Sequence, residues 1–319
     1  MKKSIFFLFL ALSWQFATAQ ESQTVYNFLR LPVSAHASSL GGENITVIED
    51  DAALMHHNPA LLQNVSDHSI SLGYMNYMSG VGAYSAAYAF HVGEKAVAGV
   101  SAQYLNYGKM KEADTDGNVI GDFNVSDFSL NATLSHRLAE RVTGGVTARF
   151  VYSSITNYHS TAVAVDLGLN YYDEERELSA SVVAKNLGGQ LSAYNEDYEK
   201  MPADLQAGIS KTLTGMPLRL SVTATDLTHW DYSFFRHLTI GADLMLSHQI
   251  YLAAGYSFRR SHQMSIASAD NDFGDNESSH GAGLSFGAGI VIDRFNIHVS
   301  YAKYHVSSSS LMVNIGFGI

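Results

Sequence analysis

The 319-residue chain contains no cysteine, only four prolines and only two tryptophans. Without cysteine there is no disulfide bond, no thiolate metal site and no cysteine nucleophile. Basic residues are also scarce, with 19 lysines and arginines against 30 aspartates and glutamates and a net charge of −11. Binding to nucleic acid or to an anionic membrane surface requires a basic face, so this balance argues against both.

The first residues have the pattern of a secretory signal peptide. Lys2 and Lys3 precede the apolar run IFFLFLALSWQF, and Ala17 and Ala19 form a small-x-small cleavage site. The apolar run is shorter than the ~20 residues that a helix needs to span a bilayer, so a membrane anchor fits less well. With no cysteine after the site, a lipoprotein anchor is excluded. We predict a signal peptide at 1–19 and export of the remaining chain.

Beyond residue 66, apolar and polar residues alternate with a period of two. In the last segment Leu311, Val313, Ile315 and Phe317 occupy every second position, which gives a strand one apolar face. The pattern recurs in about fourteen segments of roughly nine to thirteen residues, long enough for tilted strands to cross a bilayer. The predicted strands are 68–77, 81–91, 95–107, 123–136, 141–153, 159–172, 177–189, 203–213, 217–229, 236–247, 249–260, 281–292, 294–304 and 308–319.

Charged residues in the middle of these strands all fall on the polar face. They are Asp127, Arg149, Asp166, Lys185, Arg219, Asp243 and Arg259. The same face carries small residues, namely Gly145, Gly168, Gly208, Gly241 and Gly255. Small and polar residues suit a crowded lumen, whereas the uncharged opposite face suits lipid. We therefore predict an all-β, fourteen-stranded antiparallel transmembrane barrel, with a soluble β-sandwich as the alternative. The mixed signs favour ion pairing inside the lumen over a polar conduit.

The connections between the predicted strands alternate in length. Even-numbered connections are short, for example HVGEKA, YDEER and IDRF, whereas the odd-numbered ones include long segments around 108–122, 190–202 and 261–280. Outer-membrane barrels have short periplasmic turns and long extracellular loops. We expect the long loops outside the cell and both termini in the periplasm of a Gram-negative bacterium.

One connection on the long-loop side, 230–236, is rich in aromatic residues. They are Trp230, Tyr232, Phe234 and Phe235. Such clusters are enriched in the energetic centres of protein interfaces, so we expect a partner-binding loop here. An aromatic girdle at the membrane interface is the alternative.

Residues 20–66 do not alternate as the rest of the chain does. Gly41-Gly42 predicts a turn, Asp50 or Asp51 a helix N-cap, and Asn58-Pro59 the end of that helix. A fourteen-stranded barrel encloses a lumen that wall side chains alone do not fill. We predict that 20–66 form a plug with a short helix and that 67–319 form the barrel.

The plug motif resembles that of FadL-like outer-membrane proteins; its residues are Gly41, Gly42, Asp50, Asp51, Asn58, Pro59 and Ala60. Within that group, the stretch from FLRLPVSAHASSLGGENITV to HHNPALL is similar to the PorV/PorQ family of the type IX secretion system of Bacteroidetes. The barrel segments AKNLGG and TATDLTHW resemble the same family, and the likeness covers essentially the whole mature chain. One departure is the C-terminus, which reads GFGI where many outer-membrane barrels end on an aromatic residue.

The resemblance implies a non-enzymatic role. Such proteins sit in outer-membrane lipid and belong to an attachment complex, in which they hold a PorZ-like protein at the cell surface for cargo secretion and attachment. PorU and PorV belong to the same complex. The alternative implied by the FadL likeness is a transporter of hydrophobic small molecules with the plug as gate. That alternative predicts a continuous apolar pocket between plug and wall.

No catalytic, cofactor or metal site is predicted. His56 and His57 follow an acidic pair, but adjacent helical side chains point about 100° apart and do not readily share one ion. We therefore favour a packing role for them. Ser300 and Lys303 match the S-x-x-K motif of serine acylases, yet positions three apart in a strand face opposite sides. The run GAGLSFGAGI follows the strand period and does not lead into a helix, which argues against a dinucleotide site.

Overall fold

The computed structural model describes residues 24–78, 80–113, 118–230, 233–247, 249–264, 266–267, 277–278, 281–305 and 308–319. The predicted signal peptide and Tyr232 lie outside these residues. In the described part of the chain no helix is long and apolar enough to cross a membrane.

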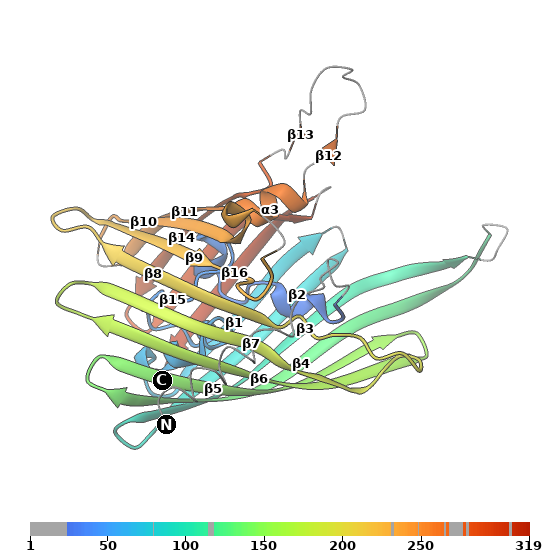
Figure 1. The fold of residues 1–319 in the computed structure, drawn as a ribbon, viewed down its shortest axis with the longest axis horizontal. Helices are drawn as coiled ribbons and strands as arrows, with labels where there is room; N and C mark the ends of the chain where they lie inside the picture. The colour runs from blue at the N-terminus through green and yellow to red at the C-terminus, as the bar shows by residue number, and fades with distance from the viewer. Residues whose placement is uncertain are drawn as a thin grey trace, which may run out of the picture.

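Fourteen antiparallel strands close into a barrel (Figure 1). The strands are β1 (Ser69–Met78), β2 (Val81–Val92), β3 (Ala96–Ala113), β4 (Val119–Ala139), β5 (Val142–Ile155), β6 (Tyr158–Asp173), β7 (Leu178–Ser192), β8 (Asp204–Thr212), β9 (Leu218–Ala224), β10 (Leu238–Met245), β11 (Ile250–Ser257), β14 (Leu284–Ile292), β15 (Phe295–His305) and β16 (Ser308–Gly318). Pairing of β1 with β16, from Ser69↔Gly318 to Asn76↔Leu311, closes the sheet. The predicted fold class is confirmed, and each predicted strand overlaps one strand of the barrel.

The barrel is apolar outside and polar inside because side chains alternate along each strand. On β6, Val163, Val165, Leu167 and Leu169 face outward and are 38–51 % exposed, whereas Asp166 between them is 1 % exposed. An outward aromatic row crosses five neighbouring strands in register, formed by Tyr74, Tyr84, Tyr104, Phe128 and Tyr152. Rows of this kind form the girdles at the edges of a membrane barrel's apolar band.

The two ends of the barrel differ. Tight turns such as 93–95, 174–177 and 293–294 lie at one end, here called the short-turn end, on the left in Figure 1. The opposite, long-loop end carries the hairpin of β3 and β4, helix α3 (Phe258–Gln263), the short helix η4 (Phe234–His237) and a small separate sheet of β12 (Ile266–Ala267) and β13 (Glu277–Ser278).

Three predicted boundaries at the long-loop end are wrong. The segment 108–122 is mostly strand, because β3 and β4 continue as a paired hairpin as far as Ala113↔Val119. Strand β9 ends at Ala224, and Asp226 takes a left-handed conformation with φ of 57°. Strand β11 ends at Ser257, whose side chain caps α3 by accepting a hydrogen bond from the Arg260 backbone N–H. A turn of helix therefore replaces the last three residues of the predicted strand 249–260.

Residues 24–66 lie inside the barrel as four short helices (Figure 1). They are η1 (Asn27–Arg30), α2 (Ala35–Ser39), η2 (Ala52–His56) and η3 (Pro59–Asn64). Helix α2 packs on β11, β14, β15 and β16, whereas η3 packs on β3 to β6. The plug therefore touches opposite parts of the wall.

The plug runs along the lumen from one end of the barrel to the other. The Val25 N–H donates to the Lys200 carbonyl in the long β7–β8 connection, and Asn296 near the short-turn end donates to the Asp50 carbonyl. Strand β1 begins and strand β16 ends at the short-turn end, as an even strand number requires. The first described residue, Thr24, lies against Lys200 at the long-loop end.

Candidate functional site

The Gly41-Gly42 turn ends α2 and brings it against the wall. Gly41 and Gly42 have φ values of 102° and 96°, and their N–H groups donate to the carbonyls of Ser38 and Ala37. Such left-handed conformations favour glycine. A Cβ at Gly41 would collide with Thr239 of β10, and a Cβ at Gly255 of β11 would collide with the backbone of Leu40. The predicted turn is confirmed, and glycine on both surfaces permits this close approach.

The acidic residues Asp50 and Asp51 form hydrogen bonds within the plug and with a residue just before β1. Asp51 caps η2 because its Oδ1 accepts a hydrogen bond from the Ala53 N–H at 2.9 Å. Asp50 accepts instead from the N–H and hydroxyl of Ser66, just before β1. Of the two predicted caps, Asp51 is the one observed, and the predicted short helix is a 3-10 helix of five residues.

Asn58 and Pro59 separate two helices. The Asn58 Oδ1 accepts from the Ala60 N–H at 2.9 Å, and its amide nitrogen donates to the Ile45 carbonyl at 3.2 Å. The pair therefore ends η2, as predicted, and also starts η3, which the sequence did not indicate. Gly145 and Gly168 lie so close to Asn58 and Pro59 that neither has room for a Cβ.

His56 and His57 are buried in the plug. Burial, reinforced by the positive charges of Arg149 and Lys185, lowers the pKa of His56 to about 3. Burial likewise lowers the pKa of His57 well below its ordinary value. The His57 Nε2 accepts from the N–H groups of Val33 and Ser34, each at 3.3 Å. Both imidazoles are therefore neutral, and His57 braces the chain that leads into α2.

Two predicted lumen charges of each sign form ion pairs between neighbouring strands of the wall. Arg149 and Asp166 lie 2.6 Å apart, and Arg219 and Asp243 lie 2.7 Å apart. All four side chains are largely buried, so pairing offsets the cost of removing them from water.

The second pair continues into the plug through His36. Its Nε2 lies 2.8 Å from Asp243 Oδ1, and its Nδ1 lies 2.6 Å from Glu49 Oε2. The imidazole ring also stacks on Tyr251 of β11, with ring centroids 4.0 Å apart. Burial opposes a charge on His36, but Glu49 and Asp243 outweigh it and raise its pKa to about 9. A buried imidazolium between two carboxylates thus links plug and wall.

The three remaining predicted lumen charges, Asp127, Arg259 and Lys185, each have a different environment. Asp127 accepts hydrogen bonds from the hydroxyls of Tyr107 and Ser153. Arg259 was predicted to lie in the middle of a strand, which is wrong: it lies on α3 and pairs with Asp226 at 3.2 Å. Lys185 is at a bulge of β7, beside Asn186, which has a φ of 55°.

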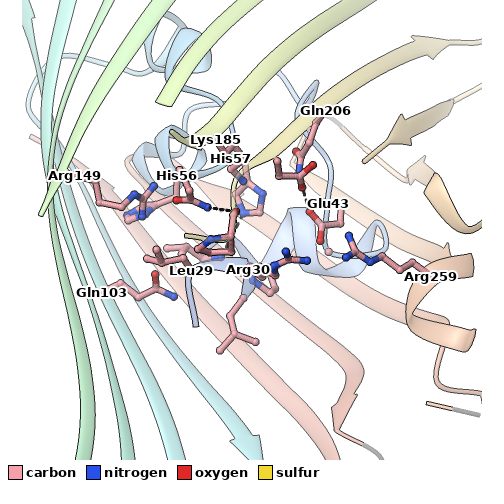
Figure 2. Close-up of a pocket in the computed structure, with 17 residues that line it drawn as sticks. Leu29, Arg30, Glu43, His56, His57, Gln103, Arg149, Lys185, Gln206 and Arg259 are labelled. Atoms are coloured by element: carbon pink, nitrogen blue, oxygen red, sulfur yellow. Dashed lines mark hydrogen bonds between the residues drawn. The ribbon is translucent and has the colours of Figure 1, made fainter. Parts of the chain in front are cut away.

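A small polar cavity lies between plug and wall near these residues. Figure 2 shows Arg30, Glu43 and His57 of the plug facing Lys185 and Gln206 of the wall and Arg259 of α3. The cavity volume is about 20 Å³, room for about one water molecule. Two further cavities lined by both plug and wall, of about 290 and 830 Å³, lie at the short-turn end and include charged side chains in their linings. These mixed, charged linings do not match the continuous apolar pocket expected of a transporter.

The long-loop end exposes the predicted aromatic residues. Trp230, Phe234 and Phe235 are 58, 56 and 63 % exposed, and Tyr232 lies outside the described residues. The Phe235 ring lies 6.2 Å from that of the half-buried Phe258 on α3, so η4 and α3 together form an aromatic surface. The prediction that this surface binds a partner is not tested by the geometry.

Several residues at the site were not singled out from the sequence. His36, Glu49 and His298 meet through tertiary packing, although Glu49 is 13 positions and His298 is 262 positions from His36 along the chain. Tyr26 is another, since its hydroxyl contacts Ser160 of β6. No spacing rule brings such distant residues together, and each looks ordinary within its own segment.

Comparison with known proteins supports the fold. No model of a known family matches the chain, and no curated protein matches it. The solved structures include the toluene transporter TodX of Pseudomonas putida, with 12 % identity, a TM-score of 0.56 and coverage of 90 % of this chain and 97 % of TodX. The monoaromatic hydrocarbon channel CymD has 13 % identity, a TM-score of 0.57 and the same coverages.

A FadL homologue of Pseudomonas aeruginosa has 12 % identity and a TM-score of 0.54, covering 90 % of this chain and 98 % of its own. At such identities the likeness concerns the fold alone. None of these three is described as an enzyme, which is consistent with a non-enzymatic role. The chain has the fold of the FadL-type outer-membrane β-barrels.

Proposed function

We propose that this protein is a sealed outer-membrane scaffold that anchors a partner protein at the cell surface, as a subunit of a type IX secretion attachment complex. The observation that carries the proposal is the tight fit of the plug. Wall glycines contact it at Gly145, Gly168 and Gly255 without room for a Cβ, and the cavity lined by Arg30 and Lys185 holds about one water molecule. A barrel filled in this way leaves its loops, rather than its lumen, to carry function.

The partner would dock on the long-loop end, which this proposal places outside the cell. The exposed rings of Trp230, Phe234 and Phe235, with the half-buried Phe258 beside them, offer area of the kind that anchors interfaces. The resemblance of the plug sequence to the PorV/PorQ family supports a PorZ-like partner, with PorU and PorV in the same complex. The same orientation leaves the end of β16 in the periplasm.

A pull-down of tagged protein from detergent-solubilised outer membrane tests this function. We expect a surface protein to be recovered with the wild type and to be lost, along with cargo attachment, when the gene is deleted. Trp230→Ala with Phe235→Ala should weaken recovery about tenfold or more, since each such anchor contributes about 2 kcal/mol. Tyr158→Ala, which removes an equally exposed aromatic at 61 %, is the matched control. Recovery of no partner by the wild type would refute anchoring.

The second candidate is transport of hydrophobic small molecules with the plug as gate. The comparisons support it more than they support anchoring, because TodX and CymD are described as a transporter and a channel for such molecules. The lumen also contains an apolar cluster, in which Phe28 and Leu29 of the plug pack with Met75, Leu105 and Met312 of the wall.

The wall next to this apolar region is incompletely paired. Strand β7 extends to Ser192, but its pairing with β8 ends at Lys185↔Asp204. Residues 24–25 of the plug lie beside this unpaired stretch, against Lys200. Movement of the 24–31 segment would open an apolar route there. Loss of toluene uptake on deletion, with partner capture unchanged, would favour transport, and the opposite pair of results would favour anchoring.

A further inference from the structure

The ion-pair network at the short-turn end contains more metal-binding groups than its hydrogen bonds use. His36 and Glu49 of the plug and His298 of β15 each offer a ligand atom, and the three atoms all lie within 4.8 Å of one another. We propose that His36, Glu49 and His298 form a site for a divalent transition metal such as Zn²⁺, which links the plug to the barrel wall. The site does not depend on which function of the barrel is correct.

Unpartnered ligand atoms are the first argument. His298 is 2 % exposed, and its Nε2 has no hydrogen-bond partner among the described residues. The Oε1 of Glu49 and the Oδ2 of Asp51 are also buried without a partner. Buried polar atoms normally have partners, so these unpartnered atoms are available to bind an ion.

Supporting hydrogen bonds are the second argument. The Nε2 of His36 contacts the Asp243 carboxylate at 2.8 Å, which leaves Nδ1 as the ligand atom. The Nδ1 of His298 contacts the Tyr251 hydroxyl at 2.7 Å, which leaves Nε2 as the ligand atom. Metal-binding histidines almost always carry such a second contact, because it fixes the tautomer and orients the ring.

Charge and geometry agree with a small dication. Glu49 and Asp243 both interact with Arg219, and Asp51 interacts with Glu49 and His298, so three carboxylates gather at this end of the lumen. A zinc ion with bonds of about 2.0–2.1 Å holds its ligand atoms about 3.3 Å apart in a tetrahedron. The His36–Glu49 contact of 2.6 Å would lengthen to this value as the metal replaces the shared proton. Imidazole and carboxylate together suit Zn²⁺ and its neighbours better than Mg²⁺ or Ca²⁺.

An access route leads to the proposed site. Glu49 and His298 line a cavity of about 290 Å³ at the short-turn end, whose other charged residues are Asp50, Asp293 and Arg294. A hydrated cation can therefore reach the ligands without removal of the plug. The fourth position would be filled by Asp51 or by water from this cavity.

The test uses the full-length folded protein in detergent, treated with EDTA and titrated with Zn²⁺ and, separately, with Co²⁺. We expect one Zn²⁺ per chain and a visible absorption of four-coordinate Co²⁺. Glu49→Gln and His298→Gln should each weaken binding about a hundredfold or more, and Asp243→Asn about ten- to a hundredfold, as for residues that orient a ligand. His56→Gln, a buried plug histidine outside the cluster, is the matched control and should bind normally.

Two results would overturn the proposal. One is a wild-type chain that retains no stoichiometric Zn²⁺, and the other is unchanged binding by Glu49→Gln and His298→Gln, which would place the metal on other histidines. Heat-modified gel migration shows whether each variant is folded. If a variant does not fold, the Co²⁺ spectrum of the wild type decides, because a six-coordinate spectrum would also refute the site. Protection of the plug from protease by Zn²⁺, in the wild type only, is the second expected result.

Discussion

The side-chain amide oxygen of Asn58 in the plug lies directly against the Cα of Gly168 on β6, where a Cβ would collide with it. The same amide caps η3 through Ala60, so the residue that starts the helix also sets the helix against the wall. This contact shows how the plug is fixed. Its turns and helix caps contact glycines on the inner face of the barrel.

Gly168→Ala should loosen the plug. The added methyl group forces Asn58 or Pro59 to shift, and overpacking of this kind costs about 1–3 kcal/mol. We expect faster protease cleavage of the plug and a lower temperature for heat-modified gel migration. Gly189→Ala is the matched control, because a Cβ there has open space and should change neither measurement. Equal behaviour of the two variants would contradict the close contact.

Asn58→Ala should destabilise the plug without changing its volume greatly. The substitution removes the cap of η3 and leaves the buried Ile45 carbonyl without its partner, at a cost of about 1–2 kcal/mol. Barrel assembly or partner retention should fall accordingly, as measured by heat-modified migration and pull-down. Asn64→Ala, at an exposed position on the same helix, should have an effect below about 0.5 kcal/mol. A normal Asn58→Ala protein would refute the structural role of this motif.

Asp166→Asn should leave Arg149 buried without its counter-ion. Loss of one partner from a buried pair costs about 3–5 kcal/mol, because the remaining charge stays desolvated. Urea unfolding of the refolded barrel should show this loss, and replacing Arg149 by methionine in the same chain should recover part of it. Arg176→Ala removes an arginine that is 75 % exposed and serves as the control, with an expected change below about 0.5 kcal/mol. No recovery in the double variant would argue against the pair.

Acid should release the plug through His56 and His57. The pKa of His56 is about 3 in the folded protein and 6.5 ordinarily, so below pH 6.5 the unfolded state binds more protons than the folded state. The contribution of His56 to the free energy of unfolding is therefore fully present above pH 6.5 and is lost toward pH 3. At pH 5 the loss is about 2 kcal/mol for His56 alone. His36 acts in the opposite direction, since its raised pKa of about 9 favours folding most below pH 6.5.

Protease cleavage of the plug between pH 7.5 and pH 5 measures this effect. We expect faster cleavage at pH 5 in the wild type and a flatter pH profile in His56→Gln. His159→Gln alters an exposed histidine and should keep the wild-type profile. Identical profiles in all three proteins would show that the buried histidines do not control plug release.

The sequence by itself determined the barrel, because alternation along each strand must match the two environments on either side of a closed sheet. Asp166 between Val165 and Leu167 already indicates which residues face the lumen. The turn at Gly41-Gly42, the cap at Asp51 and the break at Asn58-Pro59 were likewise predictable, since each depends on backbone geometry within a few residues.

Only the tertiary structure decided how plug and wall combine. His36 meets Asp243 and His298 across more than two hundred residues, and no local pattern encodes such a contact. Strand ends at the long loops were also misplaced, because the hairpin of β3 and β4 and the helix at Arg259 depend on pairing and capping rather than on alternation. The wall follows from short-range periodicity, whereas the interface that seals it arises from packing between distant segments.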